Sequence, residues 1–240
     1  MFFTLWNIFT ANWYWFMIIA VLAYLLGSIN PAVIVTRIFT KGKKDIRDMG
    51  SGNAGFTNVL RSVGKVPAII TIVCDALKCI AAVFIAYFLF KSFAAMPDNG
   101  EWFTRCYLTC VKYFAGVFCI LGHSFPLYFH FKGGKGIVTA AALMLSSDWR
   151  VFAAILATFL IIFIIGRIIS RASIVCAILY APYTFAMTFI FDHLLTQPCL
   201  WYVLIATFAS LVIGIFAIVK HKDNIKRLYN GEEKQIHAKK

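Results

Sequence analysis

Charged residues are scarce in this sequence: Asp, Glu, Lys and Arg make up 14% of its 240 residues, whereas hydrophobic residues make up 61%. A soluble domain of this length needs far more charge to cover its surface, so the scarcity excludes an ordinary soluble protein. The first apolar stretch has neither a basic segment before it nor a small-residue cleavage pattern before Gly27. We therefore expect it to be a retained membrane span and not a signal peptide.

Acidic residues are the rarer charges, because 10 Asp and Glu stand against 23 Lys and Arg, for a formal net charge of +13. A strongly basic chain can bind nucleic acid. Here, however, the Lys and Arg residues lie in short segments between apolar runs and not on one soluble domain. We therefore expect membrane lipids and phosphorylated substrates as partners, and no nucleic acid.

Closely spaced cysteine pairs are also lacking: the seven cysteines are odd in number and form no Cys-x-x-Cys pattern. Most lie within apolar runs, where a reduced cysteine packs as a small apolar residue. No disulfide framework, metal site or cofactor is expected.

What the sequence does contain is apolar runs long enough to cross a hydrocarbon core of about 30 Å. They predict six spans, at about Trp13–Arg37, Val66–Phe90, Cys106–Leu121, Val151–Gly166, Ala172–Phe191 and Leu200–Val219. A shorter apolar run, Ile137–Ser147, lies between Gly136 and Asp148.

The distribution of basic residues indicates whether this short run also crosses. Lys and Arg gather in residues 41–65, 132–135, 167–171 and 220–240, and the other loops carry little or balanced charge. These basic segments share one side of the membrane only if Ile137–Ser147 is a seventh crossing, as the positive-inside bias favours. The prediction is one membrane-embedded, all-α domain over residues 1–240, with about seven transmembrane helices, the N-terminus outside and the C-terminus cytoplasmic.

An 11-residue helix covers only about 17 Å at 1.5 Å per residue. The short helix is therefore expected to begin below the bilayer surface, sheltered by its neighbours. A helix that starts inside the membrane beside a glycine-rich loop is typical of the binding sites of transporters.

The first sequence motif, residues 48–61, is rich in glycine. Positive φ angles and close approach of backbone N–H groups to an anion are possible at three positions, Gly50, Gly52 and Gly55. A helix beginning near Asn53 would place Asn53, Thr57 and Arg61 on one face. An amide, a hydroxyl and a guanidinium so arranged can bind phosphate. A solvated turn before a capped helix is the alternative interpretation.

The second motif, Gly122–Gly136, ends in two lysines that flank two glycines and lead into the short helix. Helix N-termini favour anions, so this segment is a candidate phosphate-binding loop. It is not a Walker A loop, because Gly136 follows Lys135 and no strand precedes it. The alternative is a basic anchor to anionic lipid, although that role does not require the glycines.

The third motif, His221–Glu232, places His221, Asn224 and Arg227 or Leu228 at helical spacing, with Gly231 positioned to end the helix. A polybasic tail beside the membrane is the alternative. Within the second span, Asp75 and Lys78 are spaced for an internal ion pair. Charges at membrane depth are functional candidates, but a pair that neutralises itself favours a structural role.

The strings GSGNAGFTNVLR, GHSFPLYFHFKGGKG and HKDNIKRLYNGEE, in this order, resemble the bacterial acyl-phosphate:glycerol-3-phosphate acyltransferase family. The resemblance extends over nearly the whole chain, from Gly27 to the tail. It implies transfer of a fatty acyl group from acyl-phosphate to the 1-hydroxyl of sn-glycerol 3-phosphate, without metal or acyl-enzyme. It also implies a bacterial inner-membrane location with the active site facing the cytoplasm, and contact with the soluble enzyme that makes acyl-phosphate.

Applied to the matching positions, the resemblance gives candidate catalytic residues, which are Ser51, Arg61, Lys135, His221 and Asn224. The candidate residues for binding substrate and its phosphate are Gly50, Gly52, Asn53, Thr57, Asn58, His123, Lys132, Gly133, Gly134, Gly136, Arg227 and Glu232.

Three other classes of protein were weighed against this hypothesis. A phosphate-ester transporter usually has internal repeats, and the two halves of this sequence show no similarity. A metal-dependent phosphotransferase needs paired loop carboxylates for Mg²⁺, which are missing. A receptor or scaffold that binds anionic lipid without enzymatic activity stays an alternative. The HxxxxD pattern of acyl-CoA-using acyltransferases is absent, since Tyr128 occupies the fifth position after His123.

Overall fold

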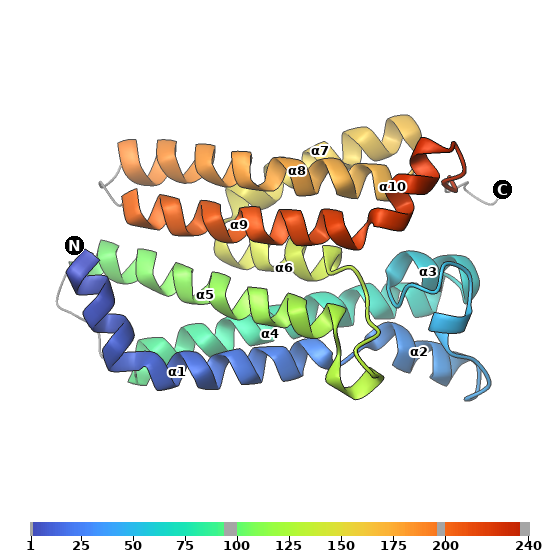
Figure 1. The fold of residues 1–240 in the computed structure, drawn as a ribbon, viewed down its shortest axis with the longest axis horizontal. Helices are drawn as coiled ribbons and strands as arrows, with labels where there is room; N and C mark the ends of the chain where they lie inside the picture. Colours follow the sequence, from blue (N-terminus) through green and yellow to red (C-terminus); the bar gives the residue numbers. More distant parts are fainter. Residues whose placement is uncertain (1, 94–99, 196–199, 236–240) are drawn as a thin grey trace. The chain divides into compact units, whose positions relative to one another are not determined.

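The structure, a computed structural model, describes residues 2–93, 100–195 and 200–235, and every regular element in these ranges is a helix (Figure 1). Within these ranges six helices are long and apolar enough to cross a membrane, and one shorter apolar helix accompanies them. The predicted all-α membrane fold with about seven spans is therefore confirmed. By its internal contacts the chain divides into two compact units, Met1–Ser147 and Asp148–Lys240.

The first unit is built from six α-helices and two 3₁₀ turns. In chain order they are α1 (Phe2–Ser28), α2 (Pro31–Phe39), η1 (Ile46–Asp48), α3 (Phe56–Ser62), α4 (Lys65–Phe93), α5 (Gly100–Ser124), η2 (Leu127–Phe129) and α6 (Ile137–Ser147).

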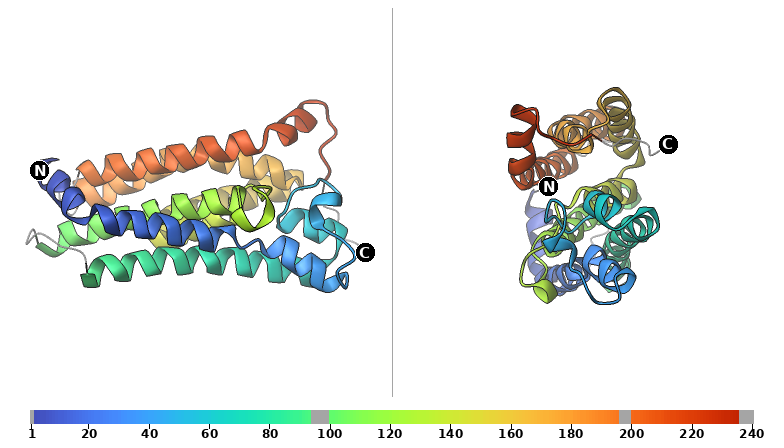
Figure 2. Two further views of the ribbon diagram at one scale, coloured as in Figure 1. Left: turned by 60° about the horizontal axis from the view of Figure 1, so that its bottom comes forward. Right: turned by 90° about the vertical axis from the view of Figure 1, so that its right-hand side faces the viewer.

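Helices α1, α4 and α5 run alongside one another, and α6 packs on α4 and α5 (Figures 1 and 2). Glycines bring α1 and α5 close together: a Cβ on Gly27 would collide with the backbone of Cys119, and one on Gly122 with the backbone of Tyr24. Small residues allow such close backbone packing in membranes. The contact fixes the C-terminal end of α5 beside that of α1.

The predicted first span, Trp13–Arg37, lies within one candidate membrane span, Trp6–Phe39, which the structure builds from two helices, α1 and α2. The side chain of Asn30 accepts a hydrogen bond from the backbone N–H of Val33 at 3.2 Å, and Pro31 is the first residue of α2. Asparagine is a favoured N-cap, and proline suits a first helical position because it has no N–H to lose. The local break therefore prevails over the continuous apolar pattern.

The short helix α6 begins and ends where the sequence predicts, at Ile137 and Ser147. Its C-terminal end is stabilised by Lys112 of α5, whose Nζ donates to the carbonyl oxygen of Ser146 at 3.0 Å. A cation at this end complements the helix dipole. Helix α5 itself is longer than the predicted Cys106–Leu121, because its first turns continue through the polar residues Glu101 and Arg105.

The second unit contains α7 (Trp149–Gly166), α8 (Ile169–Met187), the π-helical turn η3 (Thr188–Leu194), α9 (Leu200–Lys220) and α10 (Lys222–Tyr229). Helix α8 packs against α7 and α9. Asp148 caps α7 by accepting from the N–H of Arg150 at 2.9 Å. The Arg150 guanidinium then joins Asp148 to Asp192 at 2.7 and 2.8 Å. None of the cysteines that the structure describes forms a disulfide, and Cys199 lies outside the described residues.

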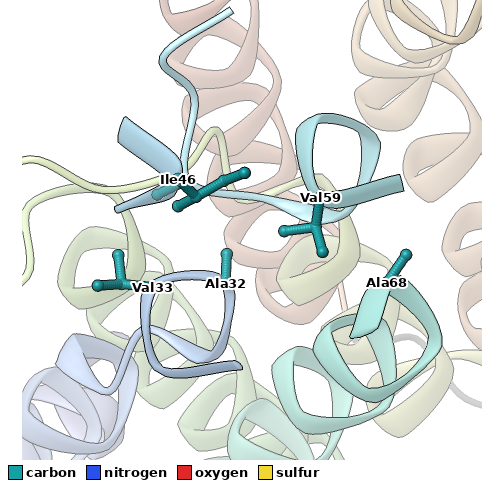
Figure 3. Close-up of a cluster of buried hydrophobic side chains, with 6 residues drawn as sticks. Ala32, Val33, Ile46, Val59 and Ala68 are labelled. Atoms are coloured by element: carbon teal, nitrogen blue, oxygen red, sulfur yellow. The ribbon is translucent and has the colours of Figure 1, made fainter. Parts of the chain in front are cut away.

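A cluster of buried apolar side chains lies beneath the first motif (Figure 3). Its members come from α2, η1, α3, α4 and the loop between them: Ala32, Val33, Ile46, Ala54, Val59 and Ala68. Burial of these side chains stabilises the loop against the helices, by about 25 cal/mol for each Å² removed from water. The glycine-rich segment is thus seated on a packed base.

Candidate functional site

The first loop, residues 45–55, is held in shape by Asn58. The Asn58 Nδ2 donates to the carbonyl oxygens of Ile46 and Met49 at 3.0 and 2.8 Å, and its Oδ1 accepts from the N–H of Ser51 at 3.1 Å. Ser62 also donates its hydroxyl to Oδ1, at 3.3 Å. Both amide protons and both acceptor positions of this buried side chain are thus in use. Asn58, predicted to bind substrate, instead shapes the loop.

Two of the three predicted flexible glycines have the expected backbone. Gly50 and Gly52 have φ angles of +56° and +70°, in the region that favours glycine. A Cβ on Gly50 would also collide with Asn58. Gly55 does not use this freedom, since its φ of −162° is extended backbone that any residue adopts. Ser51 lies exposed between the two glycines with positive φ.

The phosphate-binding stripe expected on α3 is present only in part. The helix begins at Phe56, because Gly55 is extended and its carbonyl accepts the first helical hydrogen bonds. Asn53 therefore precedes the helix, and its predicted place on the stripe is wrong. Thr57 and Arg61 lie on α3, four residues apart and on one face.

The second loop, residues 125–136, leads from α5 into the N-terminus of α6. The N–H of Gly134 donates to the carbonyl oxygen of His123 at 3.1 Å, which turns the chain back over the end of α5. Gly136, with a φ of +76°, precedes the first residue of α6. Lys132 is exposed and Lys135 is partly buried. The loop thus presents two lysines and a helix N-terminus, the combination that favours an anion.

The structure brings the first two loops together within the first unit. The Nη1 of Arg47 donates to the carbonyl oxygen of Phe129 at 2.9 Å. Asp45 holds the same guanidinium through Nε and Nη2, at 3.0 and 2.8 Å. These hydrogen bonds keep the pKa of the Asp45 carboxyl well below its usual range. A Cβ on Gly134 would lie 2.8 Å from the carbonyl oxygen of Ala54, so the loops also meet backbone to backbone.

The third motif belongs to the second unit and is organised by a glutamate that the sequence analysis missed. Glu233 accepts from Asn224 Nδ2 at 2.9 Å, from Arg227 Nε at 2.7 Å and from Ser170 Oγ at 2.9 Å. Burial raises the pKa of its carboxyl, but the hydrogen bonds and the charge of Arg227 outweigh burial, and the net pKa is lowered. Glu232, the predicted residue, is exposed.

The backbone around Glu233 explains its position. Gly231, at a φ of +72°, ends α10 as predicted. Its N–H donates to the carbonyl oxygen of Leu228, and the N–H of Glu232 donates to the carbonyl oxygen of Arg227. This pattern is a Schellman motif. It reverses the chain so that Glu233 folds back along α10. His221, just before α10, is buried, with Nδ1 2.7 Å from the carbonyl oxygen of Ala217. A carbonyl only accepts, so Nδ1 carries a proton.

The predicted Asp75–Lys78 ion pair is confirmed, with 2.8 Å between Lys78 Nζ and Asp75 Oδ1. His123 joins it, which no sequence pattern indicated, because its Nδ1 lies 3.1 Å from the same oxygen. Among the residues that the structure describes, no group of His, Cys, Asp and Glu side chains could hold a metal ion.

These features define a polytopic helical membrane protein with two glycine-rich loops in contact, the second of which carries two lysines, an arrangement of the kind that binds anions. A profile of the glycerol-3-phosphate acyltransferase family matches residues 17–231. Two similar relatives are glycerol-3-phosphate acyltransferases. That of Francisella tularensis subsp. novicida is 38% identical and that of Francisella philomiragia 37% identical, over 91% and 90% of both chains.

The fold is similar to the crystal structure of PlsY (YgiH), an integral membrane glycerol 3-phosphate acyltransferase, in its glycerol 3-phosphate form. The TM-score is 0.71 at 31% identity, over 92% of this chain and 96% of that one. The lysophosphatidic acid form of PlsY is similar to the same degree, with a TM-score of 0.71 at 30% identity. The chain therefore belongs to the glycerol-3-phosphate acyltransferase family, and it is a multi-pass integral membrane acyltransferase.

Proposed function

We propose that this protein transfers a fatty acyl group from acyl-phosphate to the 1-hydroxyl of sn-glycerol 3-phosphate, as the first step of phospholipid synthesis. The hydroxyl oxygen attacks the acyl carbonyl carbon, the bond from that carbon to the phosphate oxygen breaks, and the hydroxyl proton ends on the released phosphate. Lysophosphatidic acid and inorganic phosphate leave. The observation that carries the proposal is the contact between two anion-binding loops in one unit, through Arg47 and Phe129. Both substrates carry a phosphate, so each loop has a ligand.

The donor is an acyl-phosphate and not acyl-CoA. The HxxxxD pattern of acyl-CoA-using enzymes is absent from the sequence. An acyl-phosphate is already activated and needs no covalent serine or cysteine intermediate. The protein then contributes proximity and stabilisation of the developing negative charge. The glycerol 3-phosphate and lysophosphatidic acid forms of the related PlsY support this choice of substrate and product.

We assign roles in this reaction to the predicted residues of the three motifs. We assign catalysis to Ser51, Arg61 and Lys135 of the first unit and to His221 and Asn224 of the second. Ser51 acts as an anion-binding hydroxyl, because the glycines on both sides of it serve close approach of a ligand and not activation of a nucleophile. Binding of substrate and its phosphate is assigned to the other predicted residues except Asn58, which are Gly50, Gly52, Asn53, Thr57, His123, Lys132, Gly133, Gly134, Gly136, Arg227 and Glu232.

The test of donor and mechanism is a direct assay. Purified protein is incubated with radiolabelled glycerol 3-phosphate and palmitoyl phosphate in the presence of EDTA, and we expect radiolabelled lysophosphatidic acid to form. Intact-mass spectrometry after mixing with palmitoyl phosphate alone should show no acyl adduct, and Ser51→Ala should retain measurable activity. A stoichiometric adduct that glycerol 3-phosphate discharges would refute direct transfer. Turnover with palmitoyl-CoA as the only acyl donor would refute the assignment of acyl-phosphate as the donor.

We further propose that residues 1–240 act as one domain in the bacterial inner membrane, facing the cytoplasm, and receive acyl-phosphate from the soluble enzyme that makes it. The family match from residue 17 to residue 231 spans both units, which supports a single functional domain. The grouping of basic residues in alternate loops supports the orientation.

The orientation predicts which side of the membrane three exposed lysines face. Cysteines introduced at Lys43, Lys132 and Lys234 should all react with a membrane-impermeant reagent only when the cytoplasmic side is accessible. A cysteine at Trp6, near the N-terminus, is the control and should react from the other side. Labelling of positions 132 and 234 from opposite sides would contradict the seven-span arrangement.

A further inference from the structure

A buried cluster of charged and polar groups lies next to the second loop. Asp75 and Lys78 belong to α4, and His123 belongs to the last turn of α5; they are 2%, 7% and 4% exposed. Lys78 Nζ lies 2.8 Å from Asp75 Oδ1 and 2.9 Å from His123 Nδ1. Charges so deeply buried at membrane depth are costly unless they are compensated. Their presence calls for a reason beyond filling space.

The break between α1 and α2 supplies a further partner for the lysine. In a continuous helix the carbonyl oxygen of Ile29 would accept from the N–H of Val33. Here the N–H of Val33 bonds to the Asn30 side chain instead. Lys78 Nζ donates to the Ile29 carbonyl oxygen at 2.6 Å. The helix break, α4 and α5 therefore meet at one ammonium group.

The imidazole ring of His123 lies between the ion pair and the second loop. Its Nδ1 lies 2.9 Å from Lys78 Nζ and 3.1 Å from Asp75 Oδ1. Its Nε2 faces the second loop, because a Cβ on Gly134 would collide with it.

His123 in turn supports the second loop through both its backbone and its ring. Its carbonyl oxygen accepts from the N–H of Gly134 at 3.1 Å. A Cβ on Gly133 would collide with that same oxygen. The loop thus rests on His123 without room for a methyl group, and any movement of His123 moves the loop.

We propose that Asp75 and Lys78 are positioning residues, which hold His123 so that the second loop keeps the backbone conformation that binds phosphate. This inference rests on the proposed function, because it treats the second loop as a phosphate-binding loop. Asp75 and Lys78 touch no substrate and act through His123. A purely structural pair would affect thermal stability alone, whereas a positioning pair must also affect phosphate affinity.

The test is the double variant Asp75→Asn/Lys78→Met, which removes both charges and nearly preserves volume. Binding of glycerol 3-phosphate and of palmitoyl phosphate is measured separately in detergent, together with turnover and thermal unfolding. We expect Kd for at least one of the two ligands to rise by about tenfold to 10²-fold, because misplacement of a binding group by about 1 Å has effects of this size. Turnover at saturating substrate should fall as well, because Lys135, to which catalysis is assigned, lies in the same loop.

Lys112→Met is the matched control, since Lys112 also donates to a backbone carbonyl but at the far end of α6 from the second loop. It should lower the unfolding temperature and leave both Kd values unchanged. If the double variant does not accumulate in membranes, Asp75→Asn, which removes the carboxylate charge and keeps an acceptor oxygen in its place, is measured in the same way. Unchanged Kd values in the folded variant would overturn the positioning role. Failure of palmitoyl phosphate as donor would instead refute the proposed function, because binding is read without turnover.

Discussion

Replacing Arg61 by lysine is expected to lower kcat/KM for acyl transfer by about 10²–10³-fold, although the charge is kept. Arg61 is exposed on the last turn of α3, on the same face as Thr57. A guanidinium presents two parallel N–H groups that match two phosphate oxygens, whereas an ammonium acts as a point charge. Losing that geometry removes a hydrogen-bond donor that stabilises the negative charge developing on the phosphate. Steady-state kinetics with palmitoyl phosphate and glycerol 3-phosphate measure the effect.

The control for this substitution is Arg37→Lys. Arg37 is also exposed and lies in the first unit, but outside the three motifs, where it pairs with Asp45 at 3.0 Å. Exposed ion pairs contribute little, so its activity should stay within about twofold of the parent. Turnover of Arg61→Lys close to that of the parent would show that position 61 supplies only charge and would remove the proposed bidentate contact.

Gly134→Ala should abolish nearly all activity, with a fall of about 10²-fold or more in kcat/KM. The added methyl would collide with Nε2 of His123 and lie 2.8 Å from the carbonyl oxygen of Ala54. One neighbour is a buried ring fixed by Asp75 and Lys78, and the other is backbone of the first loop. Neither can yield easily, so the two loops must separate. Activity and substrate affinity are measured on protein whose unfolding temperature shows that it is folded.

Gly42→Ala provides the control for strain without collision. Gly42 has a φ of +76° and no atom within 4 Å of an added Cβ, and it lies outside the motifs. The substitution should cost about 1 kcal/mol of conformational strain and leave turnover unchanged. A Gly134→Ala enzyme as active as Gly42→Ala would mean that the contact between the loops is not required for catalysis.

Local features of the sequence were sufficient to predict much of this protein. The apolar runs and the grouping of basic residues identified about seven spans, including α6 at its observed bounds. Gly231 ended α10 as predicted, because a residue with positive φ is a local requirement of the helix end. The break at Asn30 and Pro31 was also local, but the longer apolar pattern concealed it.

Other features came only from packing between distant residues. His123 lies 45 residues from Lys78 in the sequence, yet their side chains are 2.9 Å apart, because α5 packs on α4. Glu233 reaches Ser170, which is 63 residues away, because a Schellman turn folds the tail back along α10. Asn58 has nearer partners, 7 and 12 residues away, but its hydrogen bonds likewise form only because the first loop folds back over α3.

The sequence by itself determined the membrane class, the spans and the three motifs, because hydrophobicity, charge and helix termination act over short stretches of chain. The tertiary structure alone decided which motif residues contact one another and which only hold others in place. A buried amide or ion pair receives its role from the partners that close packing brings within hydrogen-bond distance, whether they lie nine residues away, as Met49 does from Asn58, or on another helix, as His123 does from Asp75.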